Sequence, residues 1–253
     1  MNKDIIIFYH IFANGFYKEI LNFHLNELKS TGLYDICSNI NFGLIYRSQD
    51  ELSYVEKLVE SDGKFNLHYS RKFENLPIKP ITNEPHLCKI QLGEGETIMK
   101  MIEFCKAHPE SKNHVYLFLH TKGASFPKNL RKWKQVRELL PDLREIPQQE
   151  LQLKLNNIIS HNVIHNWQKH LCELNLKNLY YYIWNFFWVN GNFLRNFNTI
   201  DYCKYSFIGQ KVPMYTDRHF TACFPLGLHE QVNKKQMFSL EWRFNPKNFG
   251  VYF

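Results

Sequence analysis

The stretch HVYLFLHTKGASFPK, residues 114–128, decides the fold of this chain. Its first part, from Val115 to His120, is almost wholly apolar or aromatic, which is typical of a central strand covered by helices on both faces. Polar or flexible residues follow at once: His120, Thr121, Lys122 and Gly123. Ligands of open α/β sheets bind beyond the carboxyl ends of the strands, so this loop is either a ligand site or an ordinary polar turn.

The composition favours a folded protein with anionic partners. The chain has 253 residues, of which 44% are hydrophobic and 16% aromatic, enough for a substantial core. No run of eighteen apolar residues is present, so no transmembrane helix is predicted. The formal net charge of +7 favours nucleotides, nucleic acid or a membrane surface as partners, and charge alone does not choose among them.

The N-terminal segment and the cysteines indicate the compartment. The run MNKDIIIFYH is too short for a signal peptide and lacks a small-residue cleavage site, so we expect a cytoplasmic location. The six cysteines form no CxxC pair, which favours buried free thiols over a zinc knuckle or a disulfide framework.

Strands and helices alternate in the first half of the sequence. Short apolar runs predict strands at residues 4–10, 39–47 and 64–70, and helical spacing predicts helices at residues 16–29, 49–61 and 96–107. This order predicts an α/β fold with a mostly parallel, nucleotide-binding type of sheet flanked by helices.

The second half is less regular. Prolines predict a loop at residues 73–95, and residues 129–140 are predicted to form a basic amphipathic helix. A long helix is predicted from Pro147 to about Glu173. The aromatic run LYYYIWNFFWV, residues 179–189, is predicted as one strand, followed by a turn at Asn190–Gly191.

Common catalytic motifs are missing from the sequence. It contains no GxGxxG, no GxxxxGK[ST], no GxSxG, no HExxH and no Asp-x-Asp. His161 and His165 fall on a polar helix face, where histidines are usually solvated. His219 follows Asp217 at a spacing that allows the carboxylate to orient the imidazole only within a turn.

Several stretches together resemble a group of bacterial and large-virus proteins with a GT-A-like glycosyltransferase fold. The likeness rests on YLFLHTKG at Tyr116–Gly123, NFFW at Asn185–Trp188 and the pair Glu241–Trp242, and it spans most of the chain. It implies one domain over residues 1–253, with a nucleotide-sugar half (1–125), a helical segment (126–178) and an acceptor-side half (179–253). Where the family has His-Phe-Ser-Gly, this chain has Tyr181–Trp184, so its acceptor pocket differs or its activity is lost.

The resemblance implies transfer of a sugar from a nucleotide-sugar donor to a glycan or glycolipid acceptor, as in the biosynthesis of lipopolysaccharide and other surface polysaccharides. The donor site then comprises His10, Asn14, His120, Thr121, Lys122, Gly123 and Arg131. Such enzymes commonly use Mn²⁺ or Mg²⁺ held by Asp-x-Asp. Because that motif is missing, we expect Lys122, helped by His120 and Arg131, to contact the diphosphate in place of some or all of the metal, unless it is a surface lysine on a turn.

Other roles implied by the resemblance stay open. The catalytic base is Glu241 or Asp217, and Trp242 could raise the pKa of the former. His10 and Asn14 either hold the base and ribose or form a turn in which Asn14 caps a helix. The acceptor side is predicted to include Tyr182, Trp184, Trp188 and His219, with core packing as the alternative role of the aromatic rings.

A second interpretation of the sequence is a binding protein without catalytic activity. A basic α/β module could hold RNA or an anionic glycan through residues 129–137 and the aromatic strand. The lack of an RNP-like or helix-turn-helix signature disfavours nucleic acid. The same basic helix also allows peripheral contact with the inner face of a membrane that carries a lipid-linked acceptor.

Overall fold

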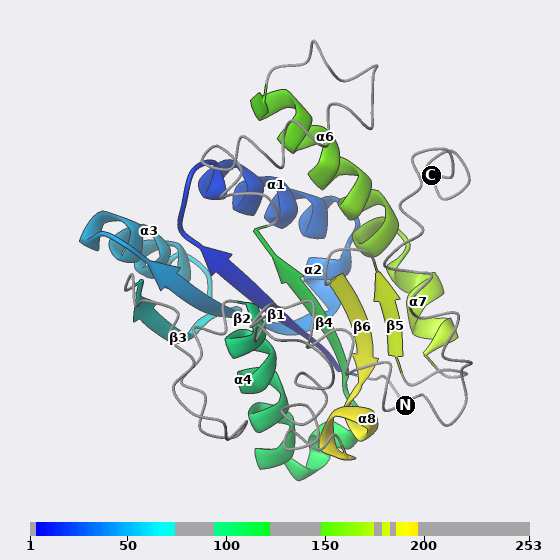
Figure 1. Ribbon diagram of the computed structural model, residues 1–253. Coiled ribbons are helices and arrows are strands. Elements are labelled where there is room, and N and C mark those ends of the chain that lie inside the picture. Colours follow the sequence, from blue (N-terminus) through cyan, green and yellow to red (C-terminus); the bar gives the residue numbers. More distant parts are fainter. Residues whose placement is uncertain (1–3, 74–93, 122–147, 175–178, 183–185, 197–253) are drawn as a thin grey trace, which may run out of the picture.

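Six strands form one sheet in the order β3-β2-β1-β4-β6-β5 (Figure 1). The computed structural model describes residues 4–73, 94–121, 148–174, 179–182 and 186–196. The strands are β1 (Ile5–Phe12), β2 (Cys37–Tyr46), β3 (Phe65–Lys72), β4 (Val115–His120), β5 (Leu179–Tyr182) and β6 (Phe186–Asn190). β3, β2, β1 and β4 are parallel, whereas β6 runs antiparallel to both β4 and β5. The predicted α/β class and the mostly parallel sheet are confirmed.

The alternation of strands and helices in the first half is also confirmed. The helices are α1 (Tyr17–Ser30), α3 (Gln49–Glu60) and α4 (Glu94–Ala107). A short helix that was not predicted, α2 (Leu33–Ile36), follows Gly32. Gly32 has φ of +72°, the left-handed conformation that commonly ends a helix, and it separates α1 from α2.

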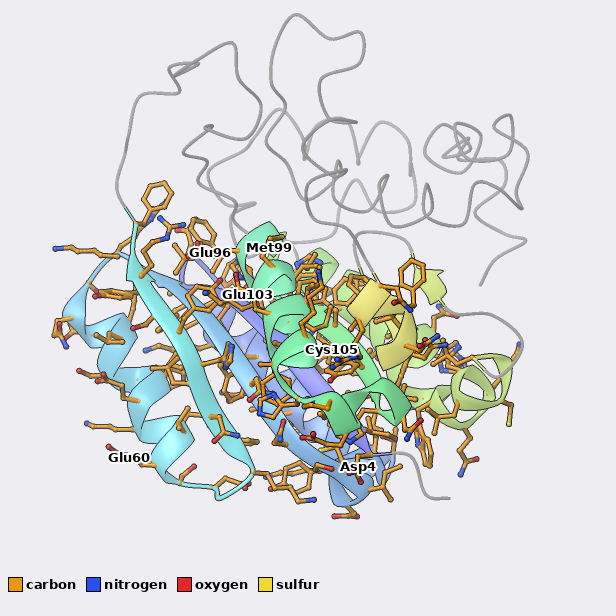
Figure 2. The ribbon with its side chains drawn as sticks, turned by 90° about the horizontal axis from the view of Figure 1, so that it is seen from below. Asp4, Glu60, Glu96, Met99, Glu103 and Cys105 are labelled. Atoms are coloured by element: carbon orange, nitrogen blue, oxygen red, sulfur yellow. The ribbon has the colours of Figure 1, made fainter. Side chains whose placement is uncertain are left out.

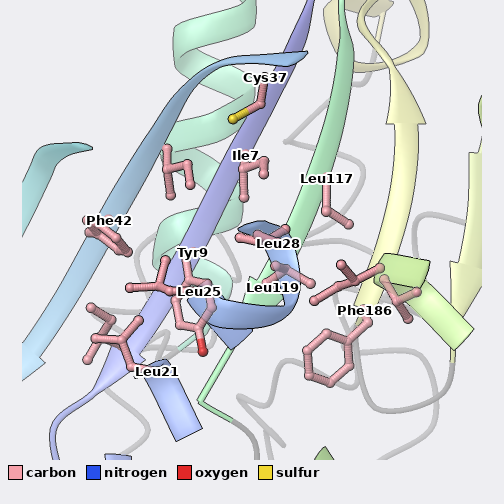
Figure 3. Close-up of a cluster of buried hydrophobic side chains, with 14 of the residues drawn as sticks. Ile7, Tyr9, Leu21, Leu25, Leu28, Cys37, Phe42, Leu117, Leu119 and Phe186 are labelled. Carbon is pink, nitrogen blue, oxygen red and sulfur yellow. The ribbon is translucent and has the colours of Figure 1, made fainter. Parts of the chain in front are cut away.

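Two apolar cores lie on opposite faces of the sheet. On β1, Ile7 and Tyr9 belong to one core, whereas Ile6 and Phe8 belong to the other. This alternation follows from the two-residue period of a strand. Figure 3 shows the first core, where leucines of α1 lie over the side chains of the parallel strands.

The second core lies under α4 (Figure 2). The predicted apolar stripe of α4 is confirmed, because Ile98, Met101, Ile102 and Cys105 are at most 1% exposed. α8 (Gly191–Asn196) packs beside α4, and a 3₁₀ turn at Pro109–Asn113 leads into β4. All six residues of β4 are buried and the strand is paired on both sides, so the predicted central strand is confirmed.

The long helix predicted to start at Pro147 is interrupted. It consists of α6 (Gln148–Ser160), a π-helical turn (His161–His165) and α7 (Trp167–Glu173). The wider π turn shifts the helical register, so that the neighbours Val163 and Ile164 are both buried. The Val163 carbonyl accepts a hydrogen bond from Trp188 Nε1 at 3.0 Å, which joins this turn to β6.

The prediction of one aromatic strand over residues 179–189 is wrong. The run forms a hairpin of β5 and β6, in which Leu179 pairs with Val189 and Tyr182 pairs with Phe186. Folding back allows the second half of the run to pair with β4, which a single straight strand could not do while keeping β5 in the sheet. Within β6 the predicted alternation holds, with Phe186 and Trp188 in one core and Phe187 in the other.

The remaining predictions concern the cysteines, membrane-spanning helices and two segments outside the described residues. Among the described cysteines, Cys37 and Cys105 are buried, as predicted, but Cys172 is exposed. No helix in the described part of the chain is long and apolar enough to cross a bilayer. The predicted basic helix at 129–140 and residues 74–93 of the predicted loop lie outside the described residues.

Candidate functional site

The strand order of the sheet reverses at β1. The chain passes from β1 to β2 on one side, and it returns from β3 to β4 on the other side of β1. In open α/β sheets such a reversal leaves a crevice at the carboxyl ends of the two strands, and ligands bind there. The carboxyl ends of β1 and β4 are therefore the candidate site.

Three of the predicted donor residues meet at this point. His10 on β1 is paired in register with His120, the last residue of β4. The Thr121 N–H donates to the His10 carbonyl at 3.0 Å, and Thr121 Oγ1 accepts from the Phe12 N–H at 3.0 Å. His10, His120 and Thr121 are each at most 5% exposed. The cluster is thus fixed by backbone pairing of two adjacent strands.

Asn14 lies beside the same strand ends and is 8% exposed. Its Oδ1 accepts a long hydrogen bond from Arg47 Nη1, at 3.4 Å. The alternative that Asn14 caps the following helix is wrong, because α1 begins at Tyr17 and Phe16 occupies its N-cap position. The Asn14 amide is instead directed to the neighbouring strand end.

A chain of hydroxyl groups supports His10 from the α4 side. Thr97 Oγ1 lies 2.8 Å from His10 Nδ1 and 2.7 Å from the hydroxyl of Tyr69. Burial raises the pKa of Tyr69 well above its ordinary value, so the phenol stays protonated. The single Thr97 proton can be donated to only one of the two neighbours. Whether His10 Nδ1 carries a proton therefore depends on whether Thr97 donates its proton to His10 or to Tyr69.

A salt bridge lies at the edge of the site, between the end of β3 and α4. Arg71 Nη2 and Nε donate to Glu96 Oε2 at 2.8 and 3.0 Å, joining the end of β3 to the first turn of α4. Figure 2 shows Glu96 at the end of α4 that lies towards the carboxyl end of β3. Because its charge is already paired, Arg71 adds little positive potential to the site.

Aromatic rings hold His120 in place. Its imidazole is stacked on Phe186 with ring centroids 4.3 Å apart, and on Phe118 at 6.1 Å. Phe118 in turn stacks on Phe187 at 5.1 Å. These contacts join the end of β4 to β6, so the hairpin has a direct part in positioning His120.

A second buried imidazole lies close to this group. His24 of α1 is fully buried, its Nδ1 lies 2.7 Å from the Tyr9 hydroxyl, and its ring contacts Phe186. Burial, and to a lesser extent the field of His120, lowers the pKa of His24 to about 3. Burial also raises the pKa of Tyr9, so both groups are neutral at physiological pH.

Two residues near the site were not among the predicted site residues. Thr97 gives no sequence signal, because its role depends on the approach of α4 to β1. Arg47 is the last residue of a predicted strand, the same position as His120, so that position was a usable signal. The structure places its guanidinium group over the rings of Phe12 and Phe73.

The structure gives Trp188 a core position. Its side chain is 0% exposed and its Nε1 donates to a backbone carbonyl, so no face of the ring is open to stack on a sugar. The backbone of Tyr182 ends β5, next to Phe186. The acceptor role of Trp188 is therefore corrected to core packing, and that of Tyr182 stays a prediction.

The other predicted site residues lie outside the described residues. They are Lys122, Gly123, Arg131, Trp184, Asp217, His219 and Glu241. Within the described ranges, no group of three or more His, Cys, Asp or Glu side chains is placed to hold a metal ion.

Comparisons with known proteins do not identify a relative. The chain was compared with protein-family models, with curated proteins and with solved structures, and none of them matches it. The case for a function rests on the sequence and on the geometry of the strand ends.

Proposed function

We propose that this protein is a glycosyltransferase with a GT-A-like fold, which moves a sugar from a nucleotide-sugar donor to a glycan or glycolipid acceptor of a surface polysaccharide. The observation that carries the proposal is the buried polar cluster of His10, His120 and Thr121 at the reversal of strand order. It coincides with the HTKG sequence on which the family resemblance depends. The strand order and the family resemblance thus favour the same strand end.

Glycosyl transfer requires a site that stabilises the charges that develop during the reaction. The reaction develops positive charge on the sugar ring and releases a nucleoside diphosphate, so the protein must stabilise the departing phosphates. His10, Asn14, His120 and Thr121 form the donor side in this proposal, and Lys122 follows them directly in the sequence. Lys122 and Arg131 supply positive charge, with or without Mn²⁺ or Mg²⁺.

The chemistry on the acceptor side is assigned by resemblance alone. Glu241 or Asp217 takes the proton of the acceptor hydroxyl if the reaction inverts the anomeric centre. Trp184 and His219 then belong to the acceptor site. Peripheral contact with a membrane would bring a lipid-linked acceptor to the protein.

Thermal stabilisation by a panel of nucleotide sugars and bare nucleotides, each with and without Mn²⁺, tests the donor site. A ligand at a hundred times its Kd stabilises the folded state by about 2.7 kcal/mol. We expect one nucleotide class to raise Tm in the wild type and to lose this effect in Lys122→Ala. The Mn²⁺ dependence then shows whether lysine replaces the usual carboxylates.

Lys57→Ala is the matched control. Lys57 is exposed in the last turn of α3, away from the carboxyl ends of the strands, so this variant should respond like the wild type. Donor hydrolysis or transfer measured on the same proteins reports catalysis. If oligonucleotides stabilise the wild type and no nucleotide does, the protein is a binding module and the transferase proposal fails.

A further inference from the structure

We infer that Arg47 binds the diphosphate of the nucleotide donor from the β2 side of the site. This inference rests on the proposed function and adds a residue that neither the motif nor the resemblance indicates. Arg47 directly follows β2, the strand next to β1 in the sheet. Its contacts, its charge and the chemistry of its neighbours each support the assignment.

Aromatic rings hold the Arg47 guanidinium group in position. Its central carbon lies 5.4 Å from the ring centroid of Phe12 and 4.9 Å from that of Phe73, and the two rings pack edge to face at 5.7 Å. Arginine stacks on aromatic faces through its planar guanidinium, which leaves the N–H groups at the rim free to bind in the plane. This packing limits the freedom that an arginine ordinarily loses when it binds an anion.

The charge of Arg47 is not neutralised within the described residues. No carboxylate of this part of the chain forms a salt bridge with its guanidinium, and the buried Nε has no hydrogen-bond partner there. In the described part of the chain, the side chain makes one hydrogen bond, the 3.4 Å contact in which Nη1 donates to Oδ1 of the neutral Asn14 amide. A buried donor without a partner is costly, and an anion would satisfy it.

Arg71 is a useful comparison, because it is a neighbouring arginine that has a structural partner. It lies near the end of the adjacent strand β3 and makes a two-nitrogen contact with Glu96. Two arginines thus lie near the ends of neighbouring strands, and within the described residues one is paired with a carboxylate whereas the other is held by rings and has no salt bridge. The difference points to a ligand for Arg47.

The start of α3 does not compete for that anion. Ser48 Oγ accepts from the Glu51 N–H, and Glu51 Oε2 accepts from the backbone N–H groups of Arg47 and Ser48. These contacts form a capping box, which places the protein's own carboxylate at the helix N-terminus. A bound anion would therefore contact the guanidinium group and not the helix end.

Arg47 is connected to the centre of the site through β1. Its guanidinium lies over the ring of Phe12, and the backbone N–H of Phe12 donates to Thr121 Oγ1. Adjacent strands are about 4.8 Å apart, so the ends of β2 and β4 are separated by roughly 10 Å. A nucleotide sugar that lies across these strand ends would bring its phosphates within reach of Arg47, and the planar fork of arginine suits phosphate oxygens.

Binding measurements on Arg47→Gln test the inference. The probes are nucleoside 5′-diphosphates, the matching nucleosides and inorganic pyrophosphate, titrated calorimetrically at low and at moderate salt. Loss of one charge-assisted phosphate contact should weaken diphosphate binding roughly 10- to 100-fold. Nucleoside binding should be unchanged, and the dependence of diphosphate binding on salt should become weaker.

Two further variants keep the test decisive. Lys72→Gln removes the same charge from the exposed end of β3, and it should change diphosphate affinity less than about threefold if only the long-range field is altered. Arg47→Lys keeps the charge and loses the planar fork, so it should show an intermediate loss even if Arg47→Gln folds poorly.

The outcomes separate this inference from the proposed function. If the wild type binds a nucleoside diphosphate and both Arg47 variants bind it equally well, the inference is wrong and the transferase proposal stands. If the wild type binds pyrophosphate through Arg47 but no nucleotide, the anion site stands and the transferase proposal fails. If the wild type binds no diphosphate and no pyrophosphate, the inference fails as well.

Discussion

His24 is a buried imidazole whose protonation is coupled to folding. Its side chain is 0% exposed, and its Nε2 has no partner among the described residues. Burial lowers its pKa from 6.5 to about 3, so the folded protein keeps it neutral at pH values where the unfolded chain takes up a proton. Its contribution to stability is fully present above pH 6.5 and is lost as the pH falls towards 3.

The pH dependence of unfolding should reveal this group. The free energy of unfolding of the wild type should fall by up to about 2 kcal/mol between pH 7 and pH 5 relative to that of His24→Gln. Denaturant melts at several pH values measure the difference. His161→Gln, which alters an exposed imidazole, should follow the wild type. Parallel curves for the wild type and His24→Gln would contradict a buried neutral His24.

Gly43 permits the close approach of the groups that support His10. A Cβ atom at this position would overlap Thr97 Oγ1 and the Tyr69 ring. An added methyl group in a packed region forces side chains apart, which typically costs about 1–3 kcal/mol. It would also separate Thr97 from His10, so a glycine on β2 is needed for the geometry of the site.

We therefore predict that Gly43→Ala lowers Tm by about 2–12 °C, since about 1 kcal/mol corresponds to about 2–4 °C in a protein of this size. It should also weaken donor binding, because His10 loses its support. Gly63→Ala is the control, as nothing lies within 4 Å of a Cβ there. Equal thermal melts for the two variants would show that the packing around Gly43 is looser than described.

At the scale of elements, the π turn at His161–His165 connects the helical segment of the second half of the chain to strand β6 of the sheet. Trp188 of β6 donates from its indole to the Val163 carbonyl in the middle of that turn, at 3.0 Å and with 0% exposure. Trp167, which begins α7, donates in a similar way to the Thr31 carbonyl at 3.1 Å but is only partly buried. The two tryptophans therefore make similar hydrogen bonds in different solvent environments.

Replacing each tryptophan by phenylalanine should separate these environments. Trp188→Phe removes a buried hydrogen bond and leaves a small cavity, so we expect a loss of about 2 kcal/mol and a Tm lower by about 4–8 °C. Trp167→Phe should cost less than about 1 kcal/mol, because water can replace the lost partner. Thermal melts followed by circular dichroism measure both. A loss for Trp167→Phe as large as that for Trp188→Phe would disprove the role given to burial.

At the scale of the whole molecule, the sheet separates two cores and places the site where they end. His10 is joined to Thr97 on the α4 face, whereas the ring of His24 lies in the layer of α1. Phe186 contacts both His24 and His120. The candidate site is thus built from both helical layers and from strands of both directions, so its geometry depends on the complete sheet.

Much of this architecture could be predicted from local sequence patterns. The apolar run ending at His120, the turn residues and the helical spacing of leucines predicted the first four strands and the three helices between them, because hydrophobic period and turn chemistry act over a few neighbouring residues. The same reasoning placed His10, His120 and Thr121 at strand ends. That the ends of β1 and β4 would be adjacent required the strand order.

The sequence by itself determined that this is an α/β protein with a central strand leading into HTKG. Only the tertiary structure decided that the aromatic run folds into a hairpin, that Trp188 is a core residue, that Thr97 lies beside His10 and that the Arg47 guanidinium lies over Phe12. Local periodicity specifies which residues turn inward, but it carries no information about which distant segment they will meet. Contacts between residues 87 positions apart, such as His10 with Thr97, are decided when the helix docks on the sheet.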